Sequence, residues 1–310
     1  MFIIINHPYE SVVKKQTRMI GYYLLRTLSW LIYKMPFRLL YLVSDLLFVF
    51  LFYLVSYRRE VVDTNLRNSF PDQSKKERDQ IAAKFYHHLC DCFLETFYFD
   101  WITEKKVQER VKFLNPEMAN DFMDQGKTVI ILMGHYNNWE CFNNWGLHTS
   151  HKSYAIYKKL RNSAFEKFYI HLRSRFGSVP LERALTFRQL SDDFRNKVPA
   201  LVLFLIDQSP RVHDIQYWTT FLNQETAVLI GPEKIAVKLN TAVLFGKTKK
   251  VKRGFYEVEF ELITDNAKAC PKFEITEKST LLMEKLIVES PEFWLWSHRK
   301  WKHKRSEIEQ

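Results

Sequence analysis

A histidine and a glutamate, His135 and Glu140, follow a short apolar run from Val129 to Met133. A run of Val, Ile and Leu without charge is typical of a strand buried on both faces, as in parallel sheets covered by helices. Gly134 allows a tight turn at the carboxyl end of this strand, where open α/β sheets place their ligands. There a carboxylate can hold an imidazole in one tautomer and leave its other nitrogen as a general base.

The spacing of this pair sets a condition on the local structure. Residues five apart in one helix point about 140° away from each other, because a turn holds about 3.6 residues. His135 can therefore meet Glu140 only if it precedes a helix and folds back over its first turn, with Asn137 or Asn138 as the expected cap. The opposing interpretation is a hydrogen-bonded structural histidine, the more common role beside a loop glycine. The position at the end of a buried strand favours catalysis.

The composition excludes several classes of protein. Only 8 of the 310 residues are Gly, and the sequence has no glycine-rich nucleotide motif and no G-x-S-x-G nucleophile elbow. The four Cys residues form neither a C-x-x-C pair nor a zinc spacing with His, so we expect reduced thiols and no metal. The formal charge of +11 indicates an acidic partner: nucleic acid, an anionic membrane surface, a phosphorylated substrate or an acidic carrier protein.

Two apolar stretches, residues 19–33 and 39–57, contain one charged residue each, Arg26 and Asp45. A transmembrane helix needs roughly 20 apolar residues, so the second stretch is marginally long enough, although Asp45 would cost about 2.5–3.5 kcal/mol there. The pattern favours membrane contact, by one or two spanning helices or by a hairpin partly in the membrane surface, over buried core helices. We therefore assign residues 1–59 to membrane-anchoring helices and 60–310 to the domain that carries His135.

A second fully buried strand, residues 199–206, runs into Asp207 and Gln208. Further strands are expected at 153–157, 242–245 and 254–263, and helices at 162–176, 183–194 and 280–289. Buried strands separated by helices predict an α/β fold with a mostly parallel central sheet covered by helices. The site should then lie along the edge where these strands end.

Three other groups of residues invite a functional interpretation. Core packing explains His87, His88, Cys90 and Cys92, on one aromatic helical stretch, better than a metal site does. His148 and His151 have no third ligand nearby and are expected at the surface. The three Trp residues among basic residues in 294–305 predict an aromatic-basic surface, which fits lipid headgroups better than nucleic acid.

The segment GHYNNWE, residues 134–140, resembles the H-x4-D/E motif of glycerolipid and lysophospholipid acyltransferases. The closer resemblance is to bacterial lipid A biosynthesis acyltransferases of the lauroyl or myristoyl type, from about residue 24 to residue 302. It is carried by blocks in the order of that family: NLRNSFPD, LRSRFG, LIDQ, TAVLIGPEKIA, KRGFYEVEF and PEFWLWSHRKWK. The motif alone is moderately specific, and the ordered set is much more so.

This resemblance implies an enzyme of the bacterial inner membrane, facing the cytoplasm, that moves a fatty acyl chain from acyl carrier protein to a hydroxyl of a lipid A precursor, a phosphorylated glycolipid. It implies His135 as general base and Glu140 as its orienting carboxylate, with no cofactor and no nucleic acid. The substrate-binding candidates are Lys158, Arg183, Asp207 and Gln208. Where the family usually has Arg followed by Pro, this chain has Lys158 followed by Lys159. A lysine cannot form the planar, bidentate hydrogen bonds that an arginine makes to phosphate.

Two alternative functions remain open at this point. The first is the same chemistry on a lysophospholipid or an aminolipid, with acyl carrier protein or acyl-coenzyme A as donor. The second is a non-enzymatic basic membrane-binding protein that uses the Trp-rich segment and the basic cluster 247–253, which leaves the His135–Glu140 arrangement unexplained. For acyl transfer, no Ser or Cys is placed as an evident nucleophile, so we expect direct transfer without an acyl-enzyme.

Overall fold

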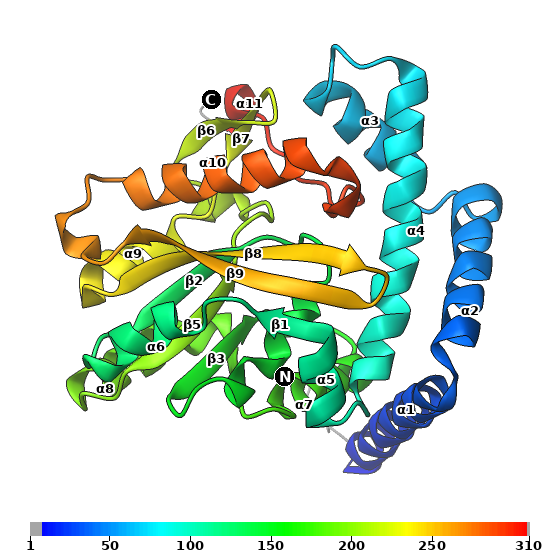
Figure 1. The fold of residues 1–310 in the computed structure, drawn as a ribbon, viewed down its shortest axis with the longest axis horizontal. Helices are drawn as coiled ribbons and strands as arrows, with labels where there is room; N and C mark the ends of the chain where they lie inside the picture. Colours follow the sequence, from blue (N-terminus) through cyan, green and yellow to red (C-terminus); the bar gives the residue numbers. More distant parts are fainter. Residues whose placement is uncertain (1–7, 309–310) are drawn as a thin grey trace, which may run out of the picture.

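The computed structural model describes residues 8–308, with side chains described from residue 19 onward, so residues 1–7 of the predicted anchor lie outside it. At its centre is a seven-stranded sheet of order β1-β9-β8-β2-β5-β3-β4 (Figure 1). Neighbouring strands are parallel except for the antiparallel pair β8–β9, which confirms the predicted mostly parallel α/β sheet. Its strands are β1 (Val111–Phe113), β2 (Val129–Met133), β3 (Lys152–Tyr157), β4 (Val179–Glu182), β5 (Ala200–Leu205), β8 (Ala242–Lys252) and β9 (Phe255–Thr264).

The central strand β2 is buried along its whole length. Val129, Ile131 and Met133 pack into the hydrophobic core on one face of the sheet, and Ile130 and Leu132 pack into the core on the other. Burial on both faces explains the unbroken apolar run in the sequence.

Helices cover both faces of the sheet, and a long helix, α4, runs along one side of it (Figure 1). The α-helices that follow the N-terminal region are α3 (Arg59–Ser69), α4 (Lys75–Phe99), α5 (Glu104–Arg110), α6 (Glu117–Asp124), α7 (Ser163–Ser174), α8 (Thr186–Arg195), α9 (Gly231–Leu239), α10 (Glu274–Glu289) and α11 (Arg305–Ile308). Short 3-10 helices are η2 (Trp139–Leu147), η3 (Arg183–Leu185), η4 (Val212–Asp214), η5 (Ala267–Ala269) and η6 (Pro291–Phe293).

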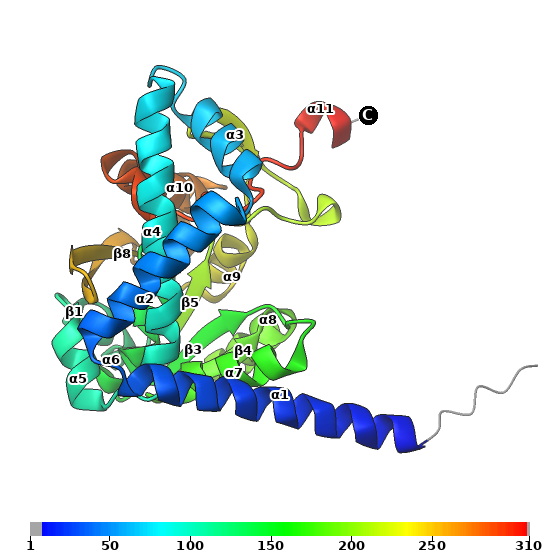
Figure 2. The same ribbon diagram turned by 90° about the vertical axis from the view of Figure 1, so that its right-hand side faces the viewer.

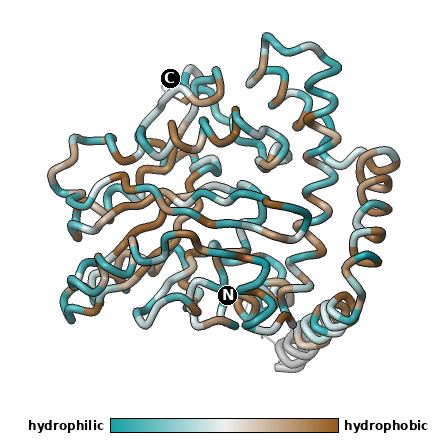
Figure 3. Tube along the Cα trace, viewed as in Figure 1, coloured by the Kyte–Doolittle hydropathy of each residue, from teal (hydrophilic) through white to brown (hydrophobic). Residues whose placement is uncertain are grey.

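The N-terminal region forms α1 (Pro8–Lys34), α2 (Phe37–Val49) and a π-helical turn, η1 (Phe50–Leu54). Helix α1 packs on α7 and α4, and α2 packs on α4, which lies between α2 and the sheet (Figures 1 and 2). Within residues 8–308, Phe37–Leu54 is the one stretch long and apolar enough to cross a membrane by length and composition, and only 11% of it is buried. Figure 3 shows α2 as a largely hydrophobic segment at the edge of the molecule.

Three features differ from the sequence-based expectations. The basic cluster 247–253 does not separate two strands, because β8 continues to Lys252 and only the turn at Arg253 and Gly254 follows. The hairpin of β6 (Trp218–Phe221) and β7 (Gln224–Ala227) was not anticipated. The predicted aromatic-basic surface is wrong for its first two tryptophans, since Trp294 and Trp296 are buried in the core beside α10.

Candidate active site

A cavity of about 660 Å³ opens at the carboxyl ends of the parallel strands. Five of the six residues singled out from the sequence line it: His135, Glu140, Lys158, Arg183 and Gln208. The sixth, Asp207, is buried directly behind His135. The apolar part of the wall includes Ala155, Ile156, Leu203, Phe204, Leu205 and Ile235.

The imidazole of His135 contacts Asp207, with its Nδ1 2.7 Å from Asp207 Oδ1. The backbone N–H of His135 donates to Asp207 Oδ2 at 2.8 Å. The sheet register creates this contact, because Met133 and Leu205 are partners on adjacent parallel strands and each candidate residue lies two positions farther on. Gly134 leaves room for the approach, since a Cβ there would lie 2.5 Å from Met283 and 3.2 Å from Asp207 Oδ2.

The surroundings of Asp207 keep its carboxylate ionised. Burial acts to raise the pKa of Asp207, but the charge and hydrogen bonds of His135 and the indole N–H of Trp294 outweigh it, and the pKa is lowered. An ionised carboxylate only accepts hydrogen bonds, so Nδ1 of His135 carries the proton. In the neutral imidazole Nε2 is then the acceptor, and the amide nitrogen of Gln208 lies 3.2 Å from it at the cavity wall.

The expected contact between Glu140 and His135 is not formed, and this corrects the predicted role of Glu140 as orienting carboxylate. Glu140 Oε1 lies 2.8 Å from Arg173 Nη2 on α7, and its Oε2 accepts from Asn143 Nδ2 at 2.6 Å. Burial acts to raise the pKa of Glu140, but Arg173 reverses the effect and the pKa is lowered. Glu140 therefore faces the same cavity as an anion, paired to a cation from another helix.

The segment after His135 also differs from the expected capped α-helix. It is a 3-10 helix, η2, which neither predicted asparagine caps with its side chain. Asn137 has a positive φ of 55° and donates to the carbonyl of Thr248, while Asn138 donates to Glu95 on α4 at 2.8 Å. Both side chains fasten the loop to neighbouring elements instead of to the helix that follows.

Four cationic side chains besides Arg173 line the cavity. Lys158 directly follows β3 and Arg183 directly follows β4, so both lie at the ends of strands, as His135 and Asp207 do. Arg211 and Lys302, which the sequence did not single out, come from the segment after β5 and from the C-terminal segment. Arg183 has one carboxylate nearby, with Asp214 at 3.5 Å.

The match to known proteins covers nearly the whole chain. The family model of the bacterial lipid A biosynthesis acyltransferases matches residues 11–303. The chain belongs to this family. It is an acyltransferase acting in lipid A biosynthesis, with a lipid A-type acceptor. No curated protein matched the chain.

Two further residues of the acyltransferase site were not predicted from the sequence, for different reasons. Arg173 was not singled out, because nothing in the local sequence of its helix indicates that its partner lies 33 positions away. Trp294 was assigned to a surface, because tryptophans among lysines and arginines look the same in sequence whether their rings point inward or outward. The alternative of a Trp-rich lipid- or nucleic-acid-binding surface loses its main support with the burial of Trp294 and Trp296.

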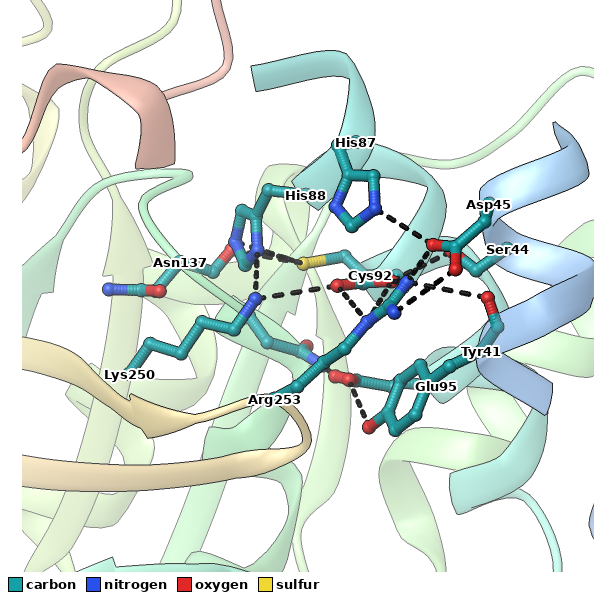
Figure 4. Close-up of polar contacts among 12 residues, drawn as sticks. Tyr41, Ser44, Asp45, His87, His88, Cys92, Glu95, Asn137, Lys250 and Arg253 are labelled. Carbon is teal, nitrogen blue, oxygen red and sulfur yellow. Dashed lines mark hydrogen bonds and ion pairs between the residues drawn. The ribbon is translucent and has the colours of Figure 1, made fainter. Parts of the chain in front are cut away.

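A buried polar network supports the His135 loop of the acyltransferase from behind (Figure 4). Glu95 on α4 accepts from Asn138 at 2.8 Å, from Tyr256 at 2.7 Å and from Tyr41 of α2 at 3.0 Å. Arg253, in the β8–β9 turn, lies 2.6 Å from both Asp45 of α2 and Asp91 of α4. The network thus joins α2, α4, the β8–β9 hairpin and the active-site loop.

The core packing predicted for the histidines and cysteines of α4 is confirmed for three of the four residues. His88, Cys90 and Cys92 are buried, and Cys92 Sγ lies 3.3 Å from His88 Nε2. Burial, reinforced by the charge of Lys250, lowers the pKa of His88 to about 3. The imidazole is therefore neutral, and the partly exposed His87 instead contacts Asp45 at 2.8 Å.

Proposed function

We propose that this acyltransferase moves a fatty acyl chain from acyl carrier protein to a hydroxyl group of a lipid A precursor, with His135 as the general base. The observation that carries the proposal is the His135–Asp207 pair, which leaves Nε2 of a cavity-lining imidazole as a proton acceptor. Transfer from a thioester to an alcohol needs a base for the hydroxyl proton and a donor for the developing oxyanion. The His135–Asp207 pair supplies the base, and the Gln208 amide supplies the hydrogen-bond donor for the oxyanion.

The reaction follows from these positions. The acceptor hydroxyl takes the place of the Gln208 amide at Nε2 of His135 and gives up its proton as its oxygen attacks the thioester carbonyl. Asp207 remains ionised and stabilises the imidazolium that forms. The ester C–O bond forms first and leaves the former carbonyl oxygen as an oxyanion. When this oxyanion collapses the C–S bond breaks, and the departing thiolate takes the proton back from His135.

We infer that the acyl group passes directly between the two substrates. Cys141, the cysteine nearest the pair in sequence, is buried, and burial raises the pKa of its thiol well above the usual value. Ser209 lines the cavity, but its hydroxyl has no hydrogen-bond partner among residues 8–308, so no base activates it. A ternary complex of donor, acceptor and enzyme fits this arrangement.

The charges and the apolar wall suit the two proposed substrates. Lys158 and Arg183 lie where they can bind phosphate groups of the acceptor, and the apolar side chains beside them can hold an acyl chain. The formal charge of +11 favours association with an acidic carrier protein. Asp207 and Gln208, expected to bind substrate, serve here as the base's orienting carboxylate and as the oxyanion donor.

We further propose that residues 1–59 attach the enzyme to the cytoplasmic face of the bacterial inner membrane, with α2 lying in the membrane surface. One face of α2 is held to the protein through Tyr41, Ser44 and Asp45. The other face exposes a continuous set of apolar side chains from α2 and η1: Leu39, Leu42, Leu46, Val49, Phe50, Tyr53 and Leu54. A helix with one polar face bound to protein and one bare apolar face fits the interface better than a span surrounded by lipid.

The decisive experiment is an assay of the purified enzyme with acyl carrier protein thioester and lipid A precursor, followed by lipid mass spectrometry. His135→Ala and Asp207→Asn should each lower kcat by about 10²–10⁴-fold. His151→Ala is the matched control, because His151 also lies 2.7 Å from an aspartate, Asp124, but away from the cavity.

Three outcomes would each overturn a part of the proposal. Full activity of His135→Ala would remove the general base. Faster turnover with acyl-coenzyme A or with a lysophospholipid would replace the proposed donor or acceptor. Rapid quench with labelled donor and no acceptor tests the direct transfer, and a stable acylated protein would contradict it.

A further inference from the structure

Trp294 lies in the segment that follows α10 and is almost completely buried, with 1% of its surface exposed. Its indole N–H donates to Asp207 Oδ2 at 2.9 Å. The same oxygen accepts the backbone N–H of His135, and the other carboxylate oxygen contacts the imidazole. Trp294 is thus the one residue other than His135 that donates a hydrogen bond to this carboxylate within residues 8–308.

The segment around Trp294 also fixes the backbone of the His135 loop. Tyr136 and Trp294 form an antiparallel β-bridge, and the N–H of Asn137 donates to the carbonyl of Phe293 at 2.9 Å. The indole itself has little freedom, because Phe221 and Trp301 pack edge-on against it, with ring centroids 5.8 and 5.9 Å away. One rigid element therefore holds both members of the catalytic pair.

We propose that Trp294 is a positioning residue for acyl transfer, whose indole N–H fixes the Asp207 carboxylate in the orientation that receives Nδ1–H of His135. This inference rests on the proposed function, since it assigns Trp294 a role through the His135–Asp207 pair. Without the indole N–H, Oδ2 of Asp207 keeps one donor, the backbone N–H of His135, which follows the movements of the loop. The carboxylate can then turn about its Cβ–Cγ bond, and the imidazole would lose its alignment with the acceptor hydroxyl.

Trp296 is the natural comparison for Trp294. It is buried in the same segment, and its indole N–H also donates a hydrogen bond, to the carbonyl of Pro291 at 2.6 Å. Its hydrogen bond does not reach Asp207. Replacing either tryptophan by phenylalanine removes a similar volume and one hydrogen bond. The two variants differ chiefly in the lost acceptor, which is Asp207 for Trp294 and the Pro291 carbonyl for Trp296.

The experiment compares Trp294→Phe, Trp296→Phe and His135→Ala in full-length enzyme with both substrates varied. Trp294→Phe should lower kcat by about 10–100-fold, the rate equivalent of one hydrogen bond to a charged group, and leave both KM values within about twofold. Trp296→Phe should retain kcat at a similar melting temperature. Equal kcat in the two Phe variants, or a change confined to KM, would overturn the inference.

A second replacement keeps the test decisive if Trp294→Phe does not fold. Incorporation of 3-benzothienylalanine at position 294 keeps the bicyclic shape and replaces the N–H by sulfur. It should lower kcat as the Phe variant does, and unchanged kcat would overturn the inference. The His135→Ala variant separates failure of this inference from failure of the proposed function. An active His135→Ala enzyme would contradict the general-base mechanism itself, whereas an inactive one leaves that mechanism standing whatever the Trp294 variants show.

Discussion

Glu140 and Arg173 form an ion pair at the wall of the active-site cavity, with Oε1 and Nη2 2.8 Å apart. Only 6% of the Glu140 side chain and 19% of the Arg173 side chain are exposed. Glu140 belongs to the H-x4-E motif, yet its partner comes from α7 and the imidazole is held by Asp207. The glutamate of the motif thus forms part of the cavity wall, and the carboxylate that contacts the imidazole lies 72 positions from His135.

The Glu140–Arg173 pair should behave as one energetic unit. Glu140→Ala and Arg173→Ala should each lower the free energy of unfolding by about 3 kcal/mol, because each leaves a buried charge without its partner. The double variant should lose less than the sum of the two, with a coupling of about 1–3 kcal/mol. Urea denaturation of the wild type, the two single variants and the double variant measures this coupling, and strictly additive losses of stability would contradict it. The exposed pair Arg59–Asp63 is the control, with an expected coupling of about 0.3–0.5 kcal/mol.

The sequence was informative wherever local pattern decides structure. The uncharged apolar runs predicted buried strands and a mostly parallel sheet. The polar residues after β2 and β5 indicated the edge of the sheet at which the cavity lies. The partner of His135 was not predictable in the same way, because it depends on the register between two strands far apart in the chain. Glu140 was the nearer carboxylate in sequence, but Asp207 is the nearer one in space because Met133 and Leu205 are register partners.

The cations at the strand ends should bind the acceptor and leave the chemistry unchanged. Lys158→Ala and Arg183→Ala should each raise KM for a phosphorylated acceptor by about tenfold or more, since each removes one charged contact to phosphate. The kcat value and the KM for the acyl donor should stay nearly constant. Lys159→Ala is the matched control, because Lys159 is the exposed neighbour of Lys158 and does not line the cavity. An equal effect at all three positions would point to the general charge of the protein instead.

The exposed apolar face of α2 should be the membrane contact. Leu42 and Leu46 are 54% and 62% exposed, so replacing both by Gln should not disturb folding. The double variant should bind liposomes more weakly, because the binding free energy loses roughly 1.5–3 kcal/mol for each leucine side chain that no longer enters the lipid. Flotation with liposomes of anionic lipid measures the loss. Leu281→Gln, on α10 and 52% exposed, is the control and should bind normally.

Labelling distinguishes a helix in the interface from one that spans. Single cysteines placed at Phe37 and Leu54, the two ends of the apolar stretch, should both react with an impermeant thiol reagent from the same side of the membrane. Reaction of the two ends from opposite sides would refute the interfacial arrangement and with it the native contact of Asp45 with Arg253.

Lys300 gives a pH dependence of stability whose sign follows from its burial. Its side chain is 4% exposed, with Nζ 5.9 Å from the centre of the Phe221 ring, and burial lowers its pKa from 10.5 to about 8 against the opposing effect of Asp207. Between these two values the unfolded chain binds more protons than the folded one, so stability from this group rises with pH. The contribution of Lys300 to stability is fully present above pH 10.5 and is lost as the pH falls through about 8.

Lys300→Met should therefore stabilise the protein at pH 7, where the wild type buries a charged ammonium group. The expected gain is about 3 kcal/mol, the equivalent of the pKa shift, and it should shrink toward zero as the pH approaches 10.5. Chemical denaturation followed by tryptophan fluorescence at pH 7, 8.5 and 10 measures the difference. A gain that does not change with pH would mean that packing alone separates Met from Lys, and a loss at pH 7 would mean that the attraction of Lys300 to Asp207 outweighs the burial of its charge.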